Sequence, residues 1–228
     1  RVLDRGVSVA LQYTYSRTTD NIANFGGTTL SPFPDGIEGG DWLRGRSDLD
    51  VPHRALLAVD WRPTDRVALG AVYRLRSGLP FTPGLRRGVD ANGDGDWTND
   101  PAYVDPALPG LDAILADNDC VRPAAGGFVA RNSCREGIAH GLDLRFEAGL
   151  ARTLLGQLSI VVDALDVIAP PVGALDRALL LVDPSGATTT DPLTGITTIP
   201  YIANPDFGER RSGTAPGVFW RVGLRITP

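Results

Sequence analysis

The chain has 228 residues, of which 43% are hydrophobic and 21% are charged, and its formal net charge is −5 at pH 7. This acidic balance, without a basic cluster interleaved with aromatic residues, argues against a nucleic-acid-binding protein. The most apolar region, Leu158 to Val182, is interrupted by Asp163, Asp166, Asp176 and Arg177, so the sequence predicts no transmembrane helix.

The start of the sequence has no basic segment followed by an apolar one, and the chain contains no Met. We therefore expect no signal peptide here. We expect that a leader and more have been removed, or that the chain is part of a longer polypeptide.

The first predicted strand covers residues 6–17, where apolar residues alternate with polar ones and two tyrosines end the apolar side. A Gly-, Asp- and Pro-rich segment, 18–52, follows without sustained periodicity and predicts an exposed loop. Next, residues 53–77 predict a hairpin that turns near Pro63, Thr64 and Asp65. Each arm is about ten residues long, with an apolar face opposite an arginine-bearing face, as a bilayer-spanning strand requires.

A second irregular segment, 78–139, contains a predicted helical turn at Leu111 to Ala116. Alternation resumes over 140–152 and 157–167, joined by a short turn at 153–156. A third long loop covers about 168–214, and the last predicted strand covers 218–227.

The predicted connections alternate long, short, long, short and long, as in outer-membrane barrels with short periplasmic turns and long extracellular loops. Six strands are fewer than the eight that normally close a barrel, and an open edge in lipid would leave backbone groups unpaired. We therefore predict an all-β fold: about six C-terminal strands of a larger antiparallel transmembrane β-barrel. Residues 1–228 belong to that barrel, with no separate second domain.

A soluble β-sandwich also alternates, and it remains the alternative fold. The long arms, the unequal loop lengths and the arginines at inward positions of four of the six strands argue against it. These inward arginines are Arg54, Arg62, Arg74, Arg76, Arg145, Arg221 and Arg225.

Two cysteines, Cys120 and Cys134, lie in one polar stretch of the second long loop. They predict a disulfide formed in an oxidising compartment, and two free thiols are the alternative. The two histidines, His53 and His140, stand at predicted strand starts and not at metal-ligand spacing, so we expect structural roles for them.

The acidic run in the second long loop places oxygen-bearing side chains at alternate positions around Gly95, like the first half of a calcium loop. Pro101 stands where such a loop would carry its bidentate Glu. The hypothesis is one calcium ion, and the alternative is a solvated cluster of Asx turns. The candidate ligands are Asp90, Asn92, Asp94, Asp96 and Asp100.

Five stretches resemble the C-terminal barrel region of TonB-dependent outer-membrane receptors, most closely the Oar-like group with a carboxypeptidase-regulatory-like domain. They are SDLDVPHR (47–54), SGLPFTP (77–83), DANGDGDWTNDPAYV (90–104), RNSCREG (131–137) and the terminal FWRVGLRI. Arg221, Gly223 and Ile226 also match the family's terminal assembly signal, although Pro228 stands where an aromatic residue is expected.

The resemblance implies a bacterial outer-membrane protein that captures a ligand or takes it up with TonB-coupled energy. Its partners would be outer-membrane lipid, upstream barrel strands and plug, and the TonB system. A passive porin, a structural or adhesive surface barrel, and a soluble secreted β-domain that binds a partner through its loops are the alternatives. No nucleophile elbow or other catalytic pattern occurs, so we do not expect an enzyme.

Overall fold

A computed structural model describes residues 2–3, 6–20, 45–86, 101–170, 172–195, 197–211, 213 and 217–228. The fold is mostly β, with one short helix, α2 (Leu111–Asp117). No helix among these residues is long and apolar enough to cross a membrane.

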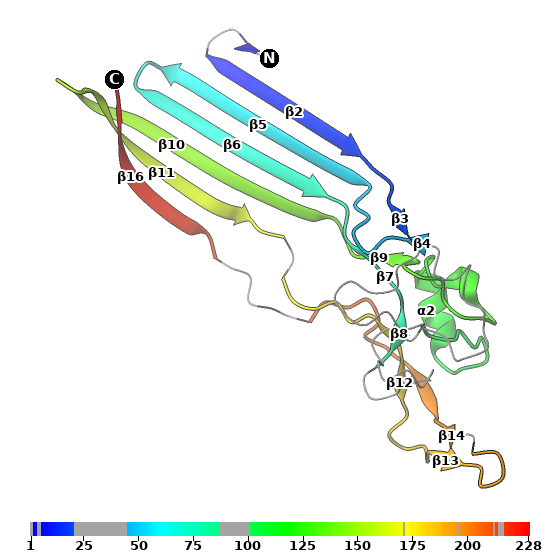
Figure 1. Ribbon diagram of the computed structural model, residues 1–228. Coiled ribbons are helices and arrows are strands. Elements are labelled where there is room, and N and C mark those ends of the chain that lie inside the picture. Colours follow the sequence, from blue (N-terminus) through cyan, green and yellow to red (C-terminus); the bar gives the residue numbers. More distant parts are fainter. Residues whose placement is uncertain are drawn as a thin grey trace.

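Six long strands form one antiparallel sheet that does not close into a barrel, and the two-residue β1 (Val2–Leu3) extends its first edge. Figure 1 shows the strands side by side in a twisted layer, with the C-terminal strand at the opposite edge. In spatial order the long strands are β2 (Val7–Tyr15), β5 (His53–Thr64), β6 (Val67–Arg76), β10 (Ala139–Thr153), β11 (Gly156–Ile168) and β16 (Phe219–Thr227).

The predicted strands are all present, with bounds that differ by a few residues. The largest local difference is at Pro63, where a break was expected but β5 continues to Thr64. The register shifts between Trp61 and Thr64, and such a bulge is where a proline is tolerated inside a sheet. The helix was expected at 111–116 and extends one residue further.

The two faces of the sheet differ along complete rows of paired residues. One row crosses all six long strands with apolar side chains only: Val7, Trp61, Leu69, Phe146, Val162 and Val222. The adjacent row, one residue along each strand, faces the other way and is polar or small: Ser8, Asp60, Gly70, Arg145, Asp163 and Arg221. We call these two surfaces the apolar face and the polar face.

Much of the apolar face is open to its surroundings. Leu11, Val222 and Leu224 are 75%, 64% and 71% exposed, whereas Asp163 on the polar face is 5% exposed. A single sheet of a water-soluble protein normally covers its apolar side. Among the described residues, no second layer covers it.

The connections alternate as predicted, and the two kinds lie at opposite ends of the sheet. The short turns after β5 and β10 lie at the end where β16 finishes, and the three long connections gather at the other end (Figure 1). We call this second end the loop-side end.

The long connections were expected to be irregular loops, but much of them folds into one body that we call the loop cap: the described residues among 77–138 and 172–211. It contains α2, the 3₁₀ turn Arg122–Ala124, and several short strand pairs (Figure 1). The pairs are β7 (Pro80–Phe81) with β9 (Cys134–Arg135), β8 (Gly84–Leu85) and β15 (Tyr201–Ala203) with β12 (Ala178–Val182), and β13 (Thr189–Thr190) with β14 (Thr197–Thr198). In the first long loop, β3 (Thr19–Asp20) pairs with β4 (Gly45–Arg46).

The loop cap has a hydrophobic core of its own. Its buried members come from the second and third long loops: Phe81, Ala102, Val104, Leu111, Val121, Val129, Cys134, Leu179, Leu180 and Phe207. Burial of this apolar surface explains why segments without sequence periodicity still fold.

Candidate functional site: the polar face and the loop cap

The polar face carries a set of ion pairs that join its strands. Asp163 on β11 accepts hydrogen bonds from Nε and Nη2 of Arg221 on β16, at 2.9 and 2.7 Å. On its other side, Nε of Arg145 lies 3.7 Å from the same carboxylate. Further along, Arg74 pairs with Asp143 at 2.7 Å, and Arg225 with Glu147 at 3.3 Å.

Four of the seven arginines predicted to face inward are therefore held by carboxylates: Arg74, Arg145, Arg221 and Arg225. Among the described residues, no ion pair holds Arg54, Arg62 or Arg76. A face built from ion pairs is suited to contact with water.

A buried polar junction joins the strands to the loop cap. Asp50, 2% exposed, accepts hydrogen bonds from the backbone N–H of Thr18 at 2.8 Å and from Nη2 of Arg135 at 2.6 Å. Nη1 of Arg135 donates to the carbonyl oxygens of Asp50 and Gly78, at 2.6 and 2.7 Å. One guanidinium thus connects the first long loop to the residue after the central hairpin.

A second arginine of the junction, Arg131, is also buried. Its Nη1 donates to Asp20 at 2.6 Å, and its Nη2 lies 3.7 Å from Asp48. The neighbouring Asn132 donates to the carbonyl oxygen of Arg46 at 2.7 Å and to Asp48 at 2.5 Å. Asn132 has a φ of 54°, a left-handed conformation that Asn tolerates better than most residues.

Three of the stretches that carry the family resemblance meet at this junction. Residues 47–54 supply Asp50, residues 77–83 supply β7, and residues 131–137 supply β9 and Arg135. The sequence pattern did not predict that these three stretches touch. Residues 47–54 and 131–137 do carry charged side chains that signal polar contacts, whereas the fold decides which partners they meet.

The predicted disulfide between Cys120 and Cys134 is present in the structure. Cys134 is 1% exposed and belongs to the core of the loop cap. The bond therefore fixes the segment after α2 against β9.

A second charged cluster ties the third long loop to the second. Glu136 receives Nη2 of Arg177 at 2.7 Å and Nη2 of Arg210 at 3.3 Å. Partial burial raises the pKa of Glu136, but the hydrogen bonds and charges of the two arginines outweigh it, so the pKa lies below its ordinary value. Nearby, Asp176 pairs with Arg86.

Both histidines lie at the loop-side end, each beside a tyrosine of the preceding long strand. Nδ1 of His53 shares a hydrogen bond with the Tyr13 hydroxyl at 2.7 Å, and Nδ1 of His140 shares one with Tyr73 at 2.6 Å. All four residues are in register with the apolar face, at its loop-side rim. Each histidine therefore joins two adjacent strands through a hydrogen bond to a tyrosine.

The predicted calcium ligands Asp90, Asn92, Asp94, Asp96 and Asp100 lie outside the described residues, so calcium binding stays a prediction. Within the described residues, no group of three or more His, Cys, Asp or Glu side chains is arranged to hold a metal ion. Calorimetric titration with calcium tests the hypothesis, and no heat at millimolar calcium would contradict it.

Comparisons with protein-family models, with curated proteins and with solved structures find no match to this chain.

Proposed function

We propose that this chain forms the C-terminal part of the barrel wall of a TonB-dependent-receptor-like protein of the bacterial outer membrane. One observation carries the proposal: the six-stranded sheet exposes its apolar face and binds its polar face together with ion pairs. In a barrel, the apolar face contacts lipid and the polar face lines the aqueous interior.

The dimensions of the apolar face fit this role. Along β16 and the residue before it, outward apolar side chains alternate from Val218 to Ile226, which is about 26 Å at about 3.3 Å per residue. A tilt of about 40° shortens this to about 20 Å, close to the apolar band of about 25 Å on outer-membrane barrels.

The sheet has two open edges, and in a membrane both need partner strands. An edge strand in lipid would leave backbone N–H and C=O groups unpaired, at several kcal/mol each. Under the proposal, further strands of the parent polypeptide pair with β2 and β16 and close the barrel. By resemblance, an upstream plug and the TonB system complete the receptor.

The arrangement of the connections supports an orientation. All three long connections lie at one end, and in outer-membrane barrels the long loops are extracellular. The disulfide of the loop cap fits the oxidising conditions outside the cell. The loop cap then stands over the mouth of the barrel, where it captures a ligand before energy-coupled uptake along the polar face.

The test is to prepare the natural polypeptide that contains this chain and refold it with and without detergent micelles. Far-UV circular dichroism follows β-structure, and gel mobility before and after boiling follows the SDS-resistant barrel. We expect cooperative β-structure and heat-modifiable mobility only with detergent. A stable fold in plain buffer would contradict the proposal and favour a soluble β-domain.

A further inference from the structure

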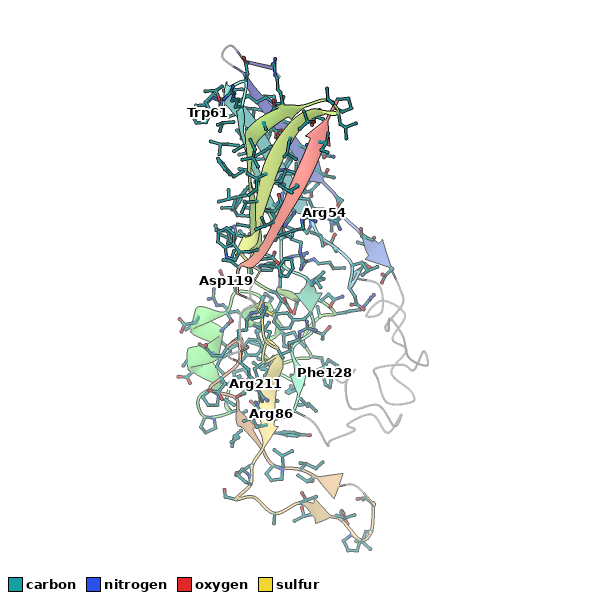
Figure 2. All side chains as sticks on the ribbon, turned by 90° about the vertical axis from the view of Figure 1, so that its left-hand side faces the viewer. Arg54, Trp61, Arg86, Asp119, Phe128 and Arg211 are labelled. Atoms are coloured by element: carbon teal, nitrogen blue, oxygen red, sulfur yellow. A yellow bond between two sulfur atoms is a disulfide. The ribbon has the colours of Figure 1, made fainter. Side chains whose placement is uncertain are left out.

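The polar face contains a cavity of about 480 Å³ at its loop-side end. Its walls include Gln12 and Thr14 on β2, Arg54 on β5, and Arg74 and Arg76 on β6. These residues lie where the strands meet the long connections, and Figure 2 labels Arg54 at this end of the sheet and Trp61 towards the other. The volume is in the range of pockets that bind small organic molecules.

Two rows of paired residues build the cavity. The row nearest the loop cap runs Thr14, Arg54, Arg76 and Ala139, and the next row runs Gln12, Leu56, Arg74 and Gly141. Both rows end on β10 with a residue that has little or no side chain. A Cβ at Gly141 would lie 3.4 Å from Nε of Arg74, so the glycine leaves room for that side chain to lie across β10 towards Asp143.

The charges in the cavity are not balanced. Arg54 and Arg76 are directly opposite each other on adjacent strands, and like charges in this position destabilise a sheet. Arg74 is neutralised by Asp143, but among the described residues no carboxylate forms an ion pair with Arg54 or Arg76. Asp166 also lines the cavity without pairing with either guanidinium.

We propose that Arg54 and Arg76 bind the phosphate group of a small organic solute. Each guanidinium presents a planar fork of N–H donors, and one such fork can donate to both oxygens of a carboxylate. Two opposed forks match the three terminal oxygens and the near-dianionic charge of a phosphate monoester. Thr14 and Gln12 provide a hydroxyl and an amide for the uncharged part of the solute.

This inference rests on the proposed function, because the polar face reaches a solute only when it lines an aqueous channel. It adds a substrate class, phosphorylated small molecules, to that function. The cavity lies at the loop-side end, so a solute that passes the loop cap would meet it first on the polar face.

The test is isothermal titration of the natural polypeptide, folded in detergent micelles, with glucose 6-phosphate, with inorganic phosphate and with glucose. We expect binding of glucose 6-phosphate, weaker binding of inorganic phosphate, and no binding of glucose. In the double variant R54Q/R76Q, affinity for glucose 6-phosphate should fall about tenfold or more, because charge-assisted hydrogen bonds are lost.

The matched control is Arg62→Gln. Arg62 is exposed, forms no ion pair among the described residues, and lies on the same face of β5 as Arg54 but near the short-turn end. Its affinity for glucose 6-phosphate should equal that of the unaltered protein. Equal losses in R62Q and in R54Q/R76Q would show general electrostatic attraction and overturn the site. If the unaltered protein binds none of the three compounds, the proposed site is also overturned. This would be the result if a carboxylate-bearing segment of the polypeptide filled the cavity.

A second measurement separates a ligand site from a structural role. Because R54Q/R76Q removes a like-charge pair, the ligand-free variant should resist denaturant at least as well as the unaltered protein. A marked loss of stability would mean that the arginines support the fold, contrary to the proposal. Gel mobility before and after boiling is recorded on every sample, so failure of the barrel itself is distinguished from failure of the site.

Discussion

Replacing Val222 with Arg tests whether the apolar face contacts lipid. Val222 is 64% exposed and ends the row of six apolar residues that crosses the sheet. In water, a substitution at such an exposed position changes stability by about 0.5 kcal/mol or less. In a bilayer, an arginine near the midplane of the lipid-facing surface costs about 2–4 kcal/mol.

The structure offers a matched control at Val218, on the same side of the same terminal segment but at the loop-side end. Near the membrane interface, the same Val-to-Arg change costs about 0–1 kcal/mol. Denaturant unfolding of the protein in lipid vesicles measures both values. If the apolar face contacts lipid, V222R should lose at least about 1 kcal/mol more than V218R, and equal, negligible losses would contradict lipid contact.

Three further predictions concern the loop cap. Reducing the bond between Cys120 and Cys134, or replacing both with Ser, should lower the stability of the loop cap by about 3 kcal/mol and expose it to protease, while the SDS-resistant sheet persists. Asp50→Asn should destabilise the loop cap by about 3 kcal/mol, because Arg135 loses its buried carboxylate; unchanged protease resistance would contradict this. The lowered pKa of Glu136 means that its ionised form stabilises the loop cap above about pH 4.3, a contribution lost as pH falls through the folded-state pKa. E136Q should therefore be less stable than the unaltered protein at neutral pH, with the difference shrinking in acid; a constant difference down to pH 2 would contradict the assignment.

The long strands were predictable because their alternation has a period of two over nine or more residues. On β16, for example, Trp220, Val222 and Leu224 alternate with Arg221 and Gly223, and this pattern fits an amphipathic strand and no helix. The inward position of the arginines followed from the same alternation. Their pairing did not, because the contact of Arg221 with Asp163 depends on the register between β11 and β16.

The loop cap was not predictable in this way. Val104 and Val129 lie in apolar groups of three residues, 102–104 and 128–130, which are too short to show a repeat that marks a buried face. Leu179 lies in a run of five apolar residues, Ala178–Val182, which does not alternate. Their burial depends on pairs between distant segments, such as the parallel contact of Gly84 with Ala178. Neither local propensity nor periodicity encodes such a contact, so these segments were interpreted as loops.

The most direct test of the central account is to measure which side of β16 meets lipid. Nitroxide spin labels are placed one at a time at positions 219–226 of the full polypeptide in lipid vesicles, and collisions with lipid-soluble oxygen and with a water-soluble nickel chelate are recorded. If the apolar face contacts lipid, contact should vary with a period of two, with oxygen contact highest at 220, 222, 224 and 226 and chelate contact highest at the positions between them. Chelate contact that is equally high on both faces would contradict a lipid-facing sheet.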